Sequence, residues 1–254
     1  MAKVITITNQ KGGVAKTTTT AALAAGLKNR GYKVLAIDLD PQGNLSSSVA
    51  VSIYEVSTVH DLMLKRISAK DVVISLPAFD IIPSNIMLAG LEHELVQAGK
   101  EYRLEETLKP VMNDYDYIVI DTPPSLGILT TNAIMIADEL IIPSTAGIFA
   151  ATGIDQLKLF IDSLVPYRRR KGELKIAGVL ITKYNNRTVI SKELKQFTEQ
   201  IATMLDTKVF STNIRFSISV EEAQASKKDI FVYSASNVTE DYNLFIDEYL
   251  KGNN

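Results

Sequence analysis

The chain has 254 residues, of which 46% are hydrophobic and 22% are charged, so it can bury a sizeable core and differs from disordered chains. It contains no cysteine, which excludes a disulfide scaffold, thiolate metal sites, iron–sulfur ligation and a cysteine nucleophile. The formal net charge is −2, whereas dedicated nucleic-acid modules are usually basic, so any DNA binding must come from a local patch. No signal-peptide pattern and no apolar run of transmembrane length is seen, and we expect a cytoplasmic protein.

Apolar, β-rich runs alternate with segments of helical periodicity along the chain. Strands are expected at residues 4–8, 33–38, 79–82, 117–121, 139–142, 174–182 and 208–210. Helices are expected at residues 17–29, 59–65, 89–98, 102–111, 126–137, 153–164, 190–205, 220–225 and 239–250. The weakly patterned segment 46–57 is expected to be a loop. The alternation predicts one α/β domain over residues 1–254, with a mostly parallel twisted sheet and helices on both faces.

The segment between the first strand and the first helix reads Lys11-Gly12-Gly13-Val14-Ala15-Lys16-Thr17-Thr18. Strand, glycine turn and helix are the context of a phosphate-binding loop, because backbone N–H groups and the helix start can surround an anion. Lys16 can reach the outer phosphates, and the Thr17 hydroxyl can ligate Mg²⁺. A tight turn with two lysines by chance is the alternative, but the flanking elements and the tandem threonines favour nucleotide binding.

This loop departs from the standard pattern G-x-x-x-x-G-K-[ST] at two positions. Gln10 and Ala15 stand where that pattern has glycine, whereas the variant K-G-G-x-x-K-[ST] fits. A methyl group at Ala15 is costly if the backbone there needs a positive φ. The second cation, Lys11, suggests a site that is completed across a dimer.

Acidic residues follow two of the expected strands. Asp38 ends the strand at 33–38 and Asp40 follows two residues later, and Asp121 ends the strand at 117–121. An aspartate at such a position beside a phosphate loop normally faces Mg²⁺, directly or through water, and one of the first pair can orient an attacking water. A helix cap or turn is the alternative for each of them alone. Ligands bind at the carboxyl ends of parallel strands, so one rim is expected from five strand-end residues, namely Thr8, Asp38, Asp121, Pro143 and Thr182.

Three motifs, supported by shorter matches further along, carry a resemblance over nearly the whole chain. They are Asn9-Gln10-Lys11-Gly12-Gly13-Val14, Asp38-Leu39-Asp40-Pro41-Gln42-Gly43-Asn44 and Asp121-Thr122-Pro123-Pro124-Ser125-Leu126-Gly127. The chain strongly resembles the ParA/Soj partition ATPases of the deviant Walker A class of P-loop NTPases, and most of all the short chromosomal, Soj-like type.

The resemblance implies an ATP- and Mg²⁺-dependent ATPase that forms an ATP-sandwich homodimer. Lys11 of each subunit would contact the partner's nucleotide, and Asp40 would position the water, so the implied catalytic residues are Asp40, Lys11 and Lys16. The implied metal residues are Thr17, Asp38 and Asp121. The implied ATP-binding residues are Lys11, Gly12, Gly13, Val14, Ala15, Lys16, Thr17, Thr18, Thr182, Ile214 and Phe216.

The same resemblance implies partners and a location. The ATP dimer would bind double-stranded DNA without sequence preference, and a ParB-type centromere-binding protein would stimulate hydrolysis and release. The protein would be cytoplasmic and nucleoid-associated, without membrane contact. Arg187 matches a DNA-contact position of the family. Ser219 replaces a second one, for which Arg215 is the expected substitute.

The residues leave several alternatives open. The run Arg168-Arg169-Arg170-Lys171 is the densest basic patch, but a charged turn is its commoner explanation. A MinD-like membrane-positioning ATPase would share the loop but needs a basic amphipathic C-terminal helix, whereas residues 239–250 carry more acid than base. A third possibility is a DNA-binding scaffold gated by nucleotide that hydrolyses poorly because of Ala15.

Overall fold

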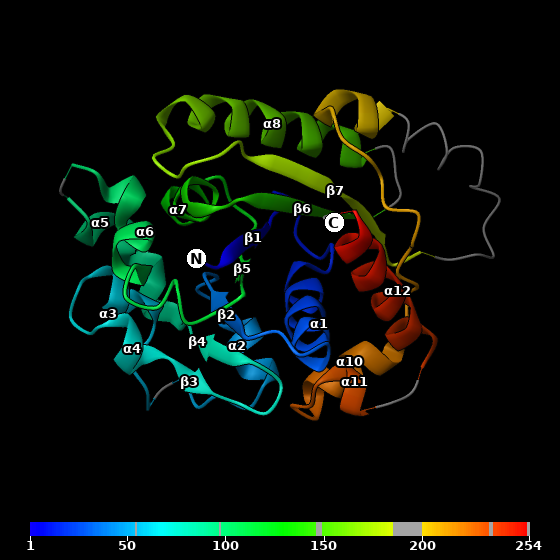
Figure 1. Cartoon of the computed structure of the whole chain (residues 1–254), viewed down its shortest axis with the longest axis horizontal. Coiled ribbons are helices and arrows are strands. Elements are labelled where there is room, and N and C mark those ends of the chain that lie inside the picture. Colours follow the sequence, from blue (N-terminus) through cyan, green and yellow to red (C-terminus); the bar gives the residue numbers. More distant parts are fainter. Residues whose placement is uncertain (54, 97, 146–148, 185–199, 234–235, 253–254) are drawn as a thin grey trace.

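The computed structural model describes residues 1–53, 55–96, 98–145, 149–184, 200–233 and 236–252. Its centre is a seven-stranded sheet in the order β3-β4-β2-β5-β1-β6-β7, twisted through the middle of the molecule (Figure 1). Every neighbouring pair is parallel except β3 with β4. The strands are β1 (Lys3–Ile7), β2 (Val34–Asp38), β3 (Ile74–Ser75), β4 (Asp80–Ile82), β5 (Tyr117–Asp121), β6 (Glu139–Thr145) and β7 (Lys175–Thr182). The expected fold class is confirmed.

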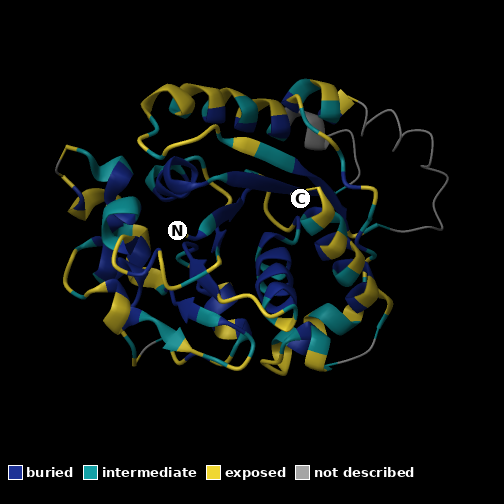
Figure 2. Ribbon diagram, in the orientation of Figure 1, coloured by how far each residue is buried: buried dark blue, intermediate teal, exposed yellow. Residues whose placement is uncertain are grey.

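Helices cover both faces of this sheet. One face packs on α1 (Lys16–Asn29) and α12 (Asn237–Lys251), and the other on α3 (Val59–Met63), α6 (Arg103–Leu108), α7 (Ile128–Ile136) and α8 (Phe149–Leu164). Adjacent residues of a strand enter opposite cores, as with Val4 and Ile5 of β1. The central strands are therefore buried on both sides, as the continuous apolar runs indicated (Figure 2).

Shorter helical segments connect these elements. They are α2 (Asn44–Ser48), α4 (Ala69–Val72), η1 (Ile86–Gly90), α5 (Leu91–Glu94), η2 (Lys100–Tyr102), η3 (Val165–Tyr167), α10 (Ile218–Ala225) and α11 (Ile230–Tyr233).

The C-terminal helix α12 uses its apolar face inside the protein. Val238, Tyr242, Phe245 and Ile246 are each 1% exposed or less and belong to the core shared with α1. Gly26 of α1 allows the close approach, since a Cβ there would lie 2.2 Å from the Ile246 Cδ1 atom. The apolar face of α12 is thus committed to the core.

Four local expectations differ from the structure. The start of segment 46–57, expected to be a loop, belongs to α2, because the buried carboxylate of Asp38 accepts hydrogen bonds from the Ser46 amide and hydroxyl. Residues 208–210 form no strand of the sheet and contribute only a bridge between Val209 and Val179. The expected helix 89–98 is a short helical turn followed by α5. Pro143 lies inside β6 and not at its end. Of the expected helix 190–205, residues 200–205 are helical, and the rest lies outside the described residues.

Helix α12 also holds residues 211–212, which follow the bridge at Val209. The Glu248 carboxylate accepts hydrogen bonds from the Ser211 amide at 2.7 Å, the Thr212 amide at 3.0 Å and the Thr212 hydroxyl at 2.8 Å. Partial burial by itself raises the pKa of Glu248, but these hydrogen bonds outweigh it, so the pKa lies below its usual value.

Glu248→Gln tests these hydrogen bonds through the pH dependence of the unfolding free energy. A carboxyl whose folded pKa is depressed stabilises the protein above its unfolded pKa and loses that contribution as pH falls through the folded value. We therefore expect the substitution to cost about 1 kcal/mol of unfolding free energy at pH 7, after allowance for partial exposure, and almost nothing near pH 3. Urea unfolding at several pH values measures it. The exposed Glu92→Gln is the control, and equal losses for Glu248→Gln at both pH values would contradict this role of the hydrogen bonds.

Candidate nucleotide-binding site

The loop between β1 and α1 is shaped by two left-handed backbone positions and by polar anchors. Gly13 has a φ of 72° and Ala15, the residue before α1, a φ of 65°. The Lys11 amide donates to the Asn9 side chain at 2.9 Å, and the Asn9 amide group donates to the carbonyl of Pro143 at 2.8 Å. The loop is therefore fixed to β6 at Pro143, and the positive φ suspected at Ala15 is present.

Lys16 reaches back across this loop. Its side-chain nitrogen donates to the carbonyl of Lys11 at 3.1 Å, and the residue is only 7% exposed. Burial lowers the pKa of Lys16, and the nearby charges of Asp121 and Asp40 oppose that shift. A buried ammonium at the mouth of a glycine loop is a ready counter-charge for a phosphate.

Asp121 lies at the base of the loop, fully buried at the end of β5. It accepts hydrogen bonds from the hydroxyls of Thr17 at 2.7 Å and Thr20 at 3.3 Å. Burial raises the pKa of Asp121 well above its usual range, and the neighbouring charge of Asp38 adds to this. The site thus holds a carboxyl that needs a proton or a cation, directly beside the threonine of the motif.

Asp38 lies opposite Asp121 on the adjacent strand and is also fully buried. Its oxygens accept from the Asp40 amide at 3.1 Å, the Ser46 amide at 2.9 Å and the Ser46 hydroxyl at 2.7 Å. Burial raises the pKa of Asp38, although these hydrogen bonds oppose the shift. These hydrogen bonds show that Asp38 fixes the turn that carries Asp40. Metal ligation by Asp38 stays a prediction.

Asp40 follows that turn and faces the open cleft. It is 8% exposed, and its carboxylate accepts from the amide of Gln42 at 2.9 Å. The side chain is thereby oriented at the cleft wall, where a carboxylate can accept a proton from water.

The cleft has a volume of about 750 Å³ and is lined by several segments that are distant in the sequence. Beside the loop and Asp40, its walls come from α2, from the end of β7 and from α10. Among the predicted residues, those lining it are Gly12, Gly13, Ala15, Lys16, Thr17, Thr18, Asp40, Ile214, Arg215 and Phe216. Sequence reasoning missed Ser47 of α2, Lys183 after β7, and Glu221 and Gln224 of α10, because no motif marks them. It also gave no role to Asn44 of α2, although Asn44 ends a quoted motif.

Three of the predicted ATP-binding residues do not line this cleft. The side chain of Val14 is buried, so only its backbone is available to a ligand. Thr182 is 1% exposed, and its hydroxyl donates to the carbonyls of Val14 at 3.1 Å and Ser144 at 3.3 Å, so it supports the loop from behind. Lys11 is exposed, and its ammonium contacts the Thr145 hydroxyl at 3.3 Å.

The donor set at the base of the loop fits Mg²⁺. Oxygen atoms from Thr17 and Asp121 meet there, and hard oxygen ligands are those that this ion prefers. Among the described residues, no group of three His, Asp or Glu side chains is placed to hold a metal by itself. A metal at this position would therefore depend on phosphate oxygens and water as well, as nucleotide-bound Mg²⁺ does.

Comparison with known proteins agrees with this geometry. Residues 2–176 match the model of an AAA domain family. The chain is 39% identical to the sporulation initiation inhibitor protein Soj of Bacillus subtilis, over 92% of each protein. It is 35% identical to the chromosome partitioning protein ParA of Caulobacter vibrioides, over 91% of this chain and 87% of that one. The chain belongs to the ParA/Soj family of ATPases.

Solved structures give the same picture of the fold. A cobyrinic acid a,c-diamide synthase from Mycobacterium smegmatis, with a bound ATP analogue and magnesium, has a TM-score of 0.84 and 31% identity, covering 99% of this chain and 95% of that one. A putative plasmid partition protein from Borrelia burgdorferi bound to AMPPNP has a TM-score of 0.79 and 24% identity, with 98% of each chain covered. The second likeness concerns the fold alone.

Two arginines, Arg187 and Arg215, are expected at the DNA face of this ParA/Soj protein. Arg187 lies outside the described residues. Arg215 forms an ion pair with Asp241 at 2.7 Å and also donates to the carbonyl of Asn237 at 3.0 Å. The hydrogen bonds that Arg215 donates to Asp241 are the largest cause of a raised pKa of Arg215, and the charges of Asp241 and Glu240 add to it. Its charge is thus largely offset within the chain.

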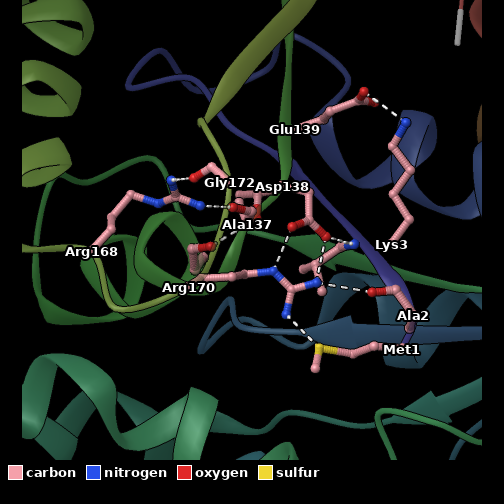
Figure 3. Close-up of polar contacts among 12 residues, drawn as sticks. Met1, Ala2, Lys3, Ala137, Asp138, Glu139, Arg168, Arg170 and Gly172 are labelled. Atoms are coloured by element: carbon pink, nitrogen blue, oxygen red, sulfur yellow. Dashed lines mark hydrogen bonds and ion pairs between the residues drawn. The ribbon is translucent and has the colours of Figure 1, made fainter.

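The basic run after α8 is mostly engaged in internal contacts (Figure 3). Arg168 donates to the carbonyls of Ala137 and Gly172, and Arg170 pairs with Asp138 and donates to the carbonyl of Ala2. The guanidinium of Arg169 lies 3.6 Å from the centre of the Tyr102 ring. These contacts tie the turn to the amino end of the sheet, which agrees with the charged-turn interpretation.

Ala15→Gly tests the strain in the loop. Alanine in the left-handed region costs about 1–2 kcal/mol, while glycine loses about 0.4–1 kcal/mol through the freedom of the unfolded chain. We expect a net stabilisation of about 0.5–1 kcal/mol in urea unfolding. Ala21→Gly, inside α1, is the control and should destabilise by about 1 kcal/mol. Destabilisation by both substitutions would show that the loop does not store this strain.

Proposed function

We propose that this protein is a partition ATPase that binds ATP with Mg²⁺ in the cleft and switches between a monomer and an ATP-sandwich dimer. The observation that carries the proposal is that the two lysines of the loop lie in different surroundings. Lys16 is buried at its own loop, whereas Lys11 is exposed and lies outside the cleft of its own subunit. An exposed cation beside a phosphate loop is available to the nucleotide of a second subunit.

We propose the following roles for the other residues of the site. The loop amides and Lys16 hold the phosphates, and Thr17 with Asp121 would hold Mg²⁺, which neutralises the phosphate charge that develops during hydrolysis. Asp40 accepts the proton of the attacking water or orients it, since its carboxylate is fixed at the cleft wall. Ile214 and Phe216 offer apolar surface for the base at the far wall.

The dimer is expected to bind double-stranded DNA without sequence preference and to release it after hydrolysis that a ParB-type protein stimulates. The names of the Soj and ParA relatives and the match over most of the chain support this part. We propose a cytoplasmic, nucleoid-associated protein. No helix among the described residues could span a membrane. The internal burial of the apolar face of α12 argues against the MinD-like alternative.

Lys11→Ala separates nucleotide binding from dimerisation. Because its ammonium lies outside its own cleft, we expect an unchanged affinity of the monomer for ATP and a loss of the ATP-dependent dimer. Binding of a labelled ATP analogue and sedimentation velocity with ATP and Mg²⁺ measure the two properties. Lys33→Ala is the control, because Lys33 is exposed and directly precedes β2, at the end of the strand away from Asp38. A Lys11→Ala variant that dimerises normally would make Lys11 a local loop residue and remove the main support of the proposal.

Asp40→Ala should stop turnover without loss of ATP affinity. A group that acts on the attacking water contributes mainly in the transition state, and its removal typically costs about 100-fold or more in rate. The trapped ATP state should then sediment as a persistent dimer. Phosphate release and sedimentation give the two readouts. Turnover at the wild-type rate would exclude Asp40 from the reaction, and this assay on the unchanged protein also decides whether it is instead a poorly hydrolysing scaffold.

DNA affinity measured against salt tests the output of the switch. With a net charge of −2, the monomer has little attraction for DNA, whereas a dimer aligns two copies of any basic patch. Each phosphate contact contributes about 0.9 to the logarithmic salt slope, so Arg187→Ala should lower the slope of the ATP dimer by about 2. Arg215→Ala should change it less, because Asp241 already offsets that charge. Equal DNA binding with ATP and with ADP would contradict the switch.

A further inference from the structure

The four consecutive threonines that open α1 do not share one role. The hydroxyl of Thr17 donates to Asp121, that of Thr20 to Asp121 and to the carbonyl of Lys16, and that of Thr19 pairs with the Tyr242 hydroxyl. Thr18 differs, because its hydroxyl accepts a hydrogen bond from the side-chain amide of Gln224 at 3.2 Å. Among the hydrogen bonds seen within the described residues, the proton of the Thr18 hydroxyl is directed to no acceptor.

Gln224 is brought to this position from the far end of the chain by the packing of α10. The Ser217 side chain caps the helix by accepting a hydrogen bond from the Ser219 amide. Ala223 is 2% exposed and packs this helix against the rest of the protein. Gln224 and Thr18 both line the nucleotide cleft, and they also line a smaller pocket between α10 and α1. The contact therefore lies at the edge of the cleft, where the first turn of α1 meets α10.

The chemistry of the two groups gives the contact a direction. A hydroxyl has one proton and two lone pairs, and an amide NH₂ can only donate. While Gln224 occupies a lone pair of the hydroxyl, the proton of Thr18 remains available to a third atom. Thr18 lines the large cleft, where the proposed function places phosphate oxygens, which are acceptors only.

We propose that Gln224 is a positioning residue, which orients the Thr18 hydroxyl so that its proton points at a phosphate of the bound nucleotide. The inference rests on the proposed nucleotide site and adds α10 to it. It makes α10, and not the loop alone, a determinant of nucleotide affinity.

The test is equilibrium binding of a labelled ATP analogue and of ADP, with Mg²⁺, to full-length variants. Gln224→Met keeps the length of the side chain and removes the donor, and we expect a two- to tenfold weaker affinity, the range of one hydrogen bond. Gln224→Glu should weaken it further, since a carboxylate takes the Thr18 proton and repels phosphate. Exposed Glu222→Gln on the same helix is the control and should bind as wild type.

A double-mutant cycle with Thr18→Val distinguishes positioning from a general effect on α10. If Gln224 acts through the hydroxyl, Gln224→Met should have no further effect in the Thr18→Val background. Equal losses in both backgrounds, or no loss in the wild-type background, would overturn the proposal. Lys16→Ala separates the two levels: if that variant binds nucleotide normally, the site itself is wrong, whereas loss of binding there with normal Gln224→Met removes only the inference.

Discussion

Two carboxyl groups buried side by side are the constraint on which the site depends. Asp38 and Asp121 are register partners on adjacent parallel strands, and neither has any exposed surface. Charged groups in such a place are costly unless they are neutralised or hydrogen-bonded. Asp38 meets this requirement through Ser46 and the Asp40 amide, and Asp121 meets only part of it through two threonine hydroxyls. A cation next to the phosphate loop would therefore stabilise the ionised carboxylate of Asp121.

The neighbouring elements follow from this arrangement. The hydrogen bonds to Asp38 fold the segment after β2 into α2, and α2 then forms one wall of the cleft. The same turn carries Asp40 to the cleft and orients its carboxylate. Lys16 supplies a nearby positive charge, at the cost of burial. Asp121 thus holds the start of α1, while Asp38 holds α2 and the turn that carries Asp40.

The opposite wall is built by the last part of the chain. Helix α12 packs its apolar face on α1, and its Glu248 and Asp241 hold the segments that contain Thr212 and Arg215. These contacts carry Phe216 and α10 over the cleft. Helix α12 therefore supports the nucleotide site from outside the cleft.

The sequence by itself determined the fold class, the phosphate loop and the acidic residues beside it. Buried parallel strands must be apolar throughout, and a phosphate loop needs glycine and lysine at set spacings, so both leave local patterns. The position of a missing glycine marked Ala15 as strained if its φ were positive, and the structure shows a φ of 65° there. Only the tertiary structure decided which residues form the walls: Lys183, Ser47 and Gln224 meet at the cleft because distant segments pack together, and no local pattern records that contact. Only the tertiary structure also decided which basic residues are engaged within the chain. Arg168, Arg170 and Arg215 are of the residue type that binds DNA phosphates, yet each contacts a partner that lies at least 26 residues away in the sequence.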